Sequence, residues 1–98
     1  MQRKLDQQGA ESVAIQALTY LAQDSERLGR FLSETGIEPS EIREAAGQPG
    51  FLLGVLEHFC ADESYLLAYA ANSRTSPEMI DSARQCLAAI AAPDDDFG

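Results

Sequence analysis

The polar residues between Glu11 and Gln23 recur at helical spacing and form one narrow stripe. They follow steps of four, three and four residues: Ser12, Gln16, Thr19 and Gln23. Almost every other position in the segment is apolar, so other elements must cover most of the circumference of this helix. We therefore expect a first helix over 11–23 at the centre of the domain.

The next two segments carry helix start and stop signals. Asp24 or Ser25 can cap a second helix, and Gly36 supplies its left-handed end. Its inward positions are Leu28, Phe31 and Leu32. Pro39 and Gly47 then frame a short third helix, because proline lacks the N–H that the first helical position leaves unused. That helix is expected to turn three side chains inward: Ile42, Ala45 and Ala46.

Residues 51–70, FLLGVLEHFCADESYLLAYA, are apolar enough to resemble a membrane span. Each acid near the centre of a span costs about 2.5 to 3.5 kcal/mol on insertion scales, and Glu57, Asp62 and Glu63 lie in the middle of this stretch. We interpret it as two helices, with Asp62 capping the second and Glu63 in its first turn. The second of them should end near Asn72. The first should bury one stripe: Phe51, Leu52, Val55, Leu56 and Phe59.

The start of a last helix is marked by Ser76 and Pro77, with Thr75 and Glu78 as an alternative capping box. Pro93 should end it. Its expected inner face consists of Met79, Ile80, Ala83, Leu87 and Ile90. No segment alternates with a period of two residues, so we predict no strand.

Together these elements predict an all-α fold, a compact orthogonal bundle of five or six short helices. The first helix should pack against the pair between Phe51 and Asn72, and the last helix should close the bundle. A chain of 98 residues suits one core, so we expect a single domain over 10–92. Residues 1–9 should form a flexible N-terminal segment and 93–98 a disordered acidic tail.

The charge balance narrows the choice of partners. Seven Lys and Arg against sixteen Asp and Glu give a net charge of −9, which repels phosphates and anionic lipids. We therefore expect no nucleic acid and no membrane as partner. Residues 38–63 hold six acids and Arg43 as their one basic residue, so they either bind a basic protein surface or act as solvated faces that keep the chain soluble.

Residues 66–84, LLAYAANSRTSPEMIDSAR, have the layout of a helix-turn-helix. A recognition helix presents Arg, Lys, Asn or Gln to the bases. Here the second helix opens instead with Glu78 and Asp81, so DNA binding is not expected.

His58, Cys60, Asp62, Glu63 and Cys86 are the residues that most resemble a ligand set. His58 and Cys60 are two positions apart and point in nearly opposite directions on a helix. A cysteine nucleophile also needs an activating base, and His58 is the one histidine. We therefore predict no metal, no cofactor, no catalytic residue and no enzymatic activity, with Cys60 as a core residue. A bond between Cys60 and Cys86 stays open.

Two cysteines are too few for a disulfide scaffold. The first residues, MQRKLDQQGAES, lack the apolar region of a secretory signal, so we expect a cytoplasmic protein. Tyr65 and Tyr69 lie one turn apart; they should be core residues, or interface residues if their face is exposed.

Several short groups of residues carry a resemblance to a known family. They are Ala10-Glu11, Leu18 with Leu21-Ala22, Arg27-Leu28 with Arg30-Phe31-Leu32, and Asp62-Glu63 ahead of Leu66-Leu67. With them the chain resembles, from Ala10 to Leu87, a family of short alphaproteobacterial proteins known as a domain of unknown function, number 3572 in that series. The resemblance implies a compact helical domain in a bacterial cytoplasm and no particular activity. Cys60 departs from the family pattern.

Two functional hypotheses follow from the sequence. The first is a non-enzymatic interaction or regulatory module that binds a protein through an exposed groove or an acidic face. The alternative is a small-molecule or metal-binding protein that uses the region around His58 and Cys60. A homodimer is compatible with both, because helices this apolar can leave a patch uncovered.

Overall fold

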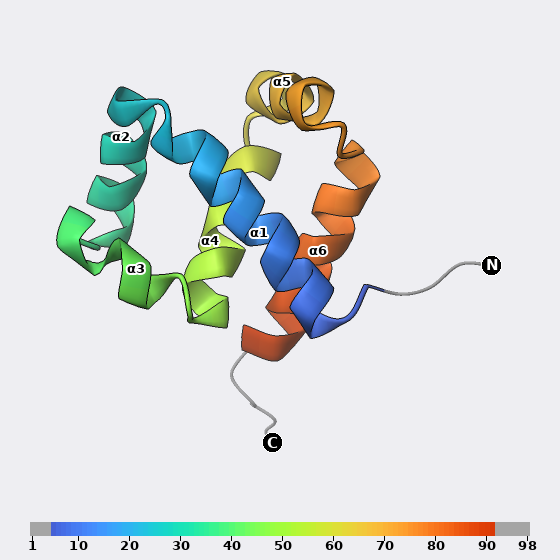
Figure 1. Ribbon diagram of the computed structural model, residues 1–98, viewed down its shortest axis with the longest axis horizontal. Coiled ribbons are helices and arrows are strands. Elements are labelled where there is room, and N and C mark those ends of the chain that lie inside the picture. The colour runs from blue at the N-terminus through green and yellow to red at the C-terminus, as the bar shows by residue number, and fades with distance from the viewer. Residues whose placement is uncertain (1–4, 92–98) are drawn as a thin grey trace.

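Six α-helices and one 3₁₀ helix make up residues 5–91, the part of the chain that the computed structural model describes (Figure 1). In chain order they are α1 (Gln7–Ala22), α2 (Ser25–Thr35), the 3₁₀ helix η1 (Pro39–Glu41), α3 (Ile42–Ala45), α4 (Pro49–Cys60), α5 (Glu63–Ser73) and α6 (Pro77–Ala91). No strand occurs within these residues. The predicted all-α bundle is therefore confirmed.

Short polar side chains start most of the long helices by binding the free N–H groups of the first turn. Asp6, Asp24 and Asp62 each accept a hydrogen bond from the backbone N–H three residues ahead, at 2.8, 3.1 and 3.2 Å. Ser76 does the same for α6, accepting from the N–H of Met79 at 3.0 Å. Such caps stabilise a helix by about 1 kcal/mol each. The predicted caps Asp24, Asp62 and Ser76 are confirmed.

The core lies where α1, α4 and α6 pack against one another. In α1 the buried side chains are mostly alanines, at positions 10, 14 and 17, which lets the neighbouring helices approach closely. The largest fully buried side chains come from all three helices: Leu21, Leu52, Val55, Leu56, Phe59, Ile80 and Leu87. The predicted stripe of α4 is thus confirmed apart from Phe51, which is half-buried.

The last helix packs against both α1 and α4 and contributes to the core, as expected of a helix that closes the bundle. Ile80, Ala83 and Leu87 are fully buried against α1 and α4. Met79 and Ile90, which we expected on the same inner face, are 40% and 39% exposed. That expectation was wrong because the three buried residues already form a narrow stripe at steps of three and four, and the two others lie at its edges.

The first helix starts earlier than its polar stripe suggests. It begins at Gln7, because Asp6 caps it, so residues 7–9 belong to α1 and to the domain that we expected to start at Ala10. Ile15 is 44% exposed, so the helix is less completely surrounded than predicted. The acidic tail expected over 93–98, and Pro93 with it, lies outside the described residues.

The chain from α2 to α3 forms an arm beside this three-helix centre (Figure 1). α5 packs across one end of the bundle, against α4 and α6. At that end Tyr20 of α1 meets the rings of Tyr65 and Tyr69 of α5, with ring centres 5.7 and 4.8 Å away.

Within residues 5–91, no helix is both long enough and apolar enough to cross a membrane.

Candidate functional site

A groove of about 430 Å³ opens between the arm and the N-terminal end of α4. It is lined by residues of the α2 end, the short helices and α4: Thr35, Ile37, Glu41, Glu44, Ala45, Gln48, Gly50, Phe51 and Gly54. The volume is in the range of ordinary ligand pockets. The groove therefore offers room for one or two side chains of a bound partner.

The left-handed turn at Gly36 shapes one wall of the groove. Gly36 ends α2 with φ of 77°, and its N–H donates to the Leu32 carbonyl at 2.8 Å. Most residues avoid this backbone region, whereas glycine adopts it without a steric cost. The turn sends Ile37 back along the arm, and the Thr35 hydroxyl stays bound to the Leu32 carbonyl at 3.1 Å.

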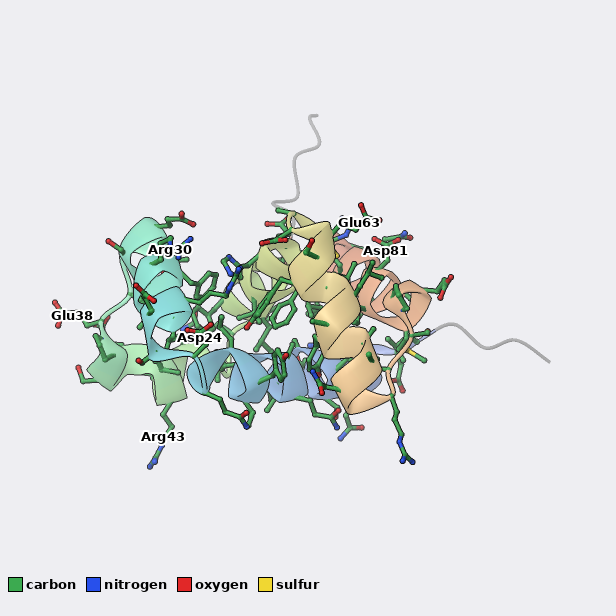
Figure 2. The ribbon with its side chains drawn as sticks, turned by 90° about the horizontal axis from the view of Figure 1, so that it is seen from above. Asp24, Arg30, Glu38, Arg43, Glu63 and Asp81 are labelled. Carbon is green, nitrogen blue, oxygen red and sulfur yellow. The ribbon has the colours of Figure 1, made fainter. Side chains whose placement is uncertain are left out.

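Two carboxylates give the groove its charge. Glu41 is held in place because one of its oxygens accepts a hydrogen bond from the Glu38 N–H at 3.0 Å. Glu44, one turn further on, has no side-chain hydrogen bond to another of residues 5–91. Arg43 is the one basic residue between Glu34 and Gly54, and it extends from the α3 end of the molecule, as does Glu38 (Figure 2). The groove is thus negative overall.

The inner surface of the groove is apolar. Ile37 and Phe51 are half-buried, and Ala45 is buried. Gly54 adds no side chain, and a Cβ built there would meet only the Phe31 ring, at 3.9 Å. A groove with an apolar base and acidic rim is suited to a side chain that has both an apolar stem and a positive end, such as arginine or lysine.

Nearer the N-terminal end of α2, the Arg27 cluster joins α2 to the corner between α4 and α5. It consists of Arg27, His58, Asp62 and Tyr65. Arg27 lies 3.3 Å from the Asp62 carboxylate and stacks over the Tyr65 ring, 3.8 Å from its centre. The Nη1 atom of Arg27 lies 3.4 Å from Nε2 of His58. Arginine only donates, so this contact is a hydrogen bond in the neutral tautomer of His58 whose Nε2 carries no proton.

The environment of the Arg27 cluster disfavours a charge on His58. Burial against aromatic rings lowers the pKa of His58, and the positive charge of Arg27 lowers it further. The Phe31 ring centre is 5.2 Å and the Tyr65 ring centre 6.1 Å from the imidazole. Burial likewise raises the pKa of the Tyr65 hydroxyl, which has no hydrogen-bond partner within residues 5–91.

Cys60 lies on the opposite side of α4 from His58. The thiol is half-buried and faces α6, near Arg84. Burial raises its pKa, although the Arg84 charge opposes that effect, so the reactive thiolate is disfavoured. Cys60, which we expected to be a core residue, is only partly buried and packs against the core. Cys60 and Cys86 are not bonded to each other.

Of the residues that most resembled a ligand set, His58 and Asp62 both contact Arg27, but Cys60 lies apart from them. His58 contacts α2, whereas Cys60 faces α6. Among residues 5–91 no group of three or more His, Cys, Asp and Glu side chains is arranged to hold a metal ion. Neither His58 nor Cys60 lines the groove. The region around them therefore does not form a common site.

Tyr65 and Tyr69 belong to an aromatic cluster inside the domain. Phe59 stacks on Tyr65 with ring centres 4.8 Å apart and contacts Tyr69 at 5.0 Å. Tyr69 is only 2% exposed. The two tyrosines are therefore core residues and do not form the interface that we had considered.

Sequence reasoning identified the acids of the groove but not the groove itself. Glu41 and Glu44 belong to the acidic stretch 38–63. Nothing in the sequence marks Thr35, Gln48 or Gly54 as residues of a binding site. The helix stop signals at Gly36 and Gly47 could have suggested the groove, because two close reversals of the chain bring the ends of successive helices together.

Comparison with known proteins places the chain in a family. No curated protein and no solved structure matches it. The model of the family described as "Protein of unknown function (DUF3572)" matches residues 7–89. This range runs from the start of α1 into the last turn of α6 and includes both the groove and the Arg27 cluster. The chain therefore belongs to the DUF3572 family of proteins of unknown function.

Proposed function

We propose that this domain is a non-enzymatic interaction module of the cytoplasm that binds a basic segment of a partner protein in the groove between the arm and α4. The observation that carries the proposal is the combination of Glu41 and Glu44 with an apolar surface of Ile37 and Phe51 in one groove. Arginine and lysine match both parts, because their stems are apolar and their ends are positive.

The charge of the whole chain supports this choice of partner. A net charge of −9 attracts a basic segment over distances up to about 8 to 10 Å at moderate salt and raises the rate of encounter. Within the groove, the exposed carboxylates of Glu41 and Glu44 would then pair with one basic side chain and fix its position. Specificity would come from the neighbouring apolar side chain of the partner against Phe51.

The chemistry of His58 and Cys60 supports a binding role over a catalytic one. The Nε2 atom of His58, one of the two ring nitrogens that could accept a proton, faces Arg27 at 3.4 Å. Burial raises the pKa of the Cys60 thiol. The two groups also lie on opposite sides of α4, so one cannot activate the other.

Selection of peptides from a random display library tests this function. We expect the wild-type domain to enrich peptides in which Arg or Lys neighbours an aliphatic or aromatic residue. The double variant Glu41→Gln and Glu44→Gln should lose these peptides. The matched control is Glu11→Gln with Glu78→Gln, which changes the net charge equally but lies outside the groove lining.

Each outcome of the peptide selection either supports or refutes binding of a basic segment in the groove. Enrichment that the groove variant loses and the control variant keeps would support the proposal. Equal loss in both variants would mean that net charge alone attracts the peptides, and no enrichment by the wild type would mean that the groove binds no such segment. Either of those two results would refute it.

A further inference from the structure

We propose that two copies of this domain pair through the outward face of α5, with the two helices antiparallel. The occupant of this face is a second copy of the chain, and the proposal is independent of the groove. It depends on the order of charged and apolar residues along α5 and on how that helix lies in the fold.

α5 turns one face inward and leaves the opposite face uncovered by the described residues. Tyr69 points into the aromatic cluster and is 2% exposed, whereas Leu67 is 49% exposed. Figure 2 looks at the molecule from the side on which α5 lies, and no other helix of residues 5–91 crosses in front of it. At 100° per residue, Leu67 shares the outward face with Ser64, Ala68 and Ala71.

This outward face carries no charge along its length, and a charged residue stands at each end of the helix. Glu63 begins α5, and Arg74 follows its last residue in the left-handed conformation, with φ of 60°. Neither of them forms an ion pair within residues 5–91. Between them the exposed face holds no charge. A second helix that packs on Leu67 therefore needs a small apolar surface flanked by charges of opposite order.

α5 itself meets that requirement when it is reversed. The helix from Glu63 to Arg74 is about 16 Å long at 1.5 Å per residue. In an antiparallel pair, Glu63 of each copy lies against Arg74 of the other, and Leu67 packs on the small residues Ala68 and Ala71. A parallel pair would instead place like charges together at both ends, which is unfavourable. Charge order thus selects the two-fold, antiparallel arrangement.

The small area of the outward face of α5 determines the affinity that we expect for the dimer. One eleven-residue helix buries less than the roughly 1,200 Å² of a standard stable interface, and two copies of a chain with net charge −9 repel each other. The pairing should therefore be weak and visible only at high protein concentration, with a dissociation constant on the order of 100 µM.

Sedimentation equilibrium of the purified domain from about 10 µM to about 1 mM, a range that brackets this strength, tests the pairing. We expect the average mass to rise toward that of a dimer. Leu67→Gln should weaken the association at least about tenfold, a loss typical of a central contact. Ile15 on α1 is 44% exposed, close to the 49% of Leu67, and Ile15→Gln should leave the association unchanged.

Exchanging the charges at the two ends of α5 distinguishes the antiparallel pair from non-specific association. Arg74→Glu should abolish the association because both ends of the pair then carry like charges. The double variant Glu63→Arg with Arg74→Glu keeps the net charge and should restore it. Arg43→Glu, at the α3 end away from Glu63 (Figure 2), changes the net charge as Arg74→Glu does and should have little effect.

Backbone amide shifts of the wild-type protein provide a readout that needs no variant. On dilution, the shifts that change should be those of α5, from Glu63 to Arg74. A wild-type mass that stays monomeric throughout, concentration-dependent shifts elsewhere on the surface, or a double variant that fails to recover association would each overturn the proposal.

Discussion

The guanidinium carbon of Arg27 lies 3.8 Å from the centre of the Tyr65 ring, so a side chain of α2 covers an aromatic residue of α5. The two residues are 38 positions apart in the chain (65 − 27). Arg27 also holds Asp62, the cap of α5, at 3.3 Å. This contact fixes α2, and with it the arm, to the rest of the bundle.

Replacing Arg27 with methionine should lower the free energy of unfolding by about 0.5 to 2 kcal/mol, the range of a partly desolvated cation–π contact. The ion pair adds little, because the Asp62 side chain is 41% exposed. Methionine keeps the apolar stem, so the loss reports the charge. Urea unfolding measures it. Arg30→Met on the same helix should change stability by less than about 0.5 kcal/mol; equal losses in both variants would contradict a special role for Arg27.

Replacing Tyr65 with phenylalanine should leave the stability unchanged or raise it by up to about 1 kcal/mol. The Tyr65 hydroxyl is buried without a hydrogen-bond partner within residues 5–91, and a buried polar group without a partner is destabilising. The ring that stacks on Phe59 and under Arg27 remains in the variant. Thermal unfolding is the measurement, and a clear loss of stability would mean that the hydroxyl is bound.

Stability should fall as the pH decreases through the range in which His58 titrates. Burial and the Arg27 charge lower the pKa of His58 below 6.5 in the folded state, so the unfolded chain binds the proton more tightly. The contribution is fully present above about pH 6.5 and is lost as the pH falls toward the lower, folded pKa. The groups that face His58 are Arg27, Arg30, Glu34 and Asp62.

This pH effect can be assigned because the chain has one histidine. Urea unfolding between about pH 7.5 and pH 5.5 should show the decrease, since ordinary carboxyl groups titrate below that range. The variant His58→Gln keeps an acceptor for Arg27 and should show a flat profile. A wild-type profile without slope, or the same slope in the variant, would count against a lowered pKa of the half-buried His58 imidazole.

Two glycines of α2 should respond in opposite directions to alanine. Gly29 lies inside the helix on an exposed face, and a Cβ there meets nothing within 4 Å, so Gly29→Ala should stabilise the domain by about 0.5 to 1 kcal/mol. Gly36 has φ of 77°, so Gly36→Ala should destabilise it by about 1 kcal/mol or more. Thermal unfolding of both variants checks this, and effects of the same sign would contradict the left-handed turn.

Local signals in the sequence predicted the helices well. Asp24, Asp62 and Ser76 each lie directly before a helix and cap it, because a cap depends on only three or four neighbouring residues. Asp62 in particular divides the apolar stretch 51–70 into α4 and α5. The buried stripe of α4 was also predictable, since helical spacing alone decides which residues share a face.

Contacts between residues far apart in the sequence were harder to predict. The stacking of Arg27 on Tyr65 depends on how α2 and α5 are placed, and no local pattern encodes that. The exposure of Met79 and Ile90 depends on where α1 and α4 lie beside α6. The groove was missed for the same reason, because it is formed by residues from four helices and from the turns between them, and several of these residues have no distinctive chemistry.

The groove is tested most directly by a titration of the ¹⁵N-labelled domain with a short acetylated peptide of alternating arginine and leucine, followed by backbone amide shifts. We predict that the largest changes map to the groove, including the amides of Gly50 and Gly54, and that Glu41→Gln with Glu44→Gln abolishes them. Changes spread evenly over all acidic surfaces, or changes that persist unaltered in that variant, would contradict binding in the groove.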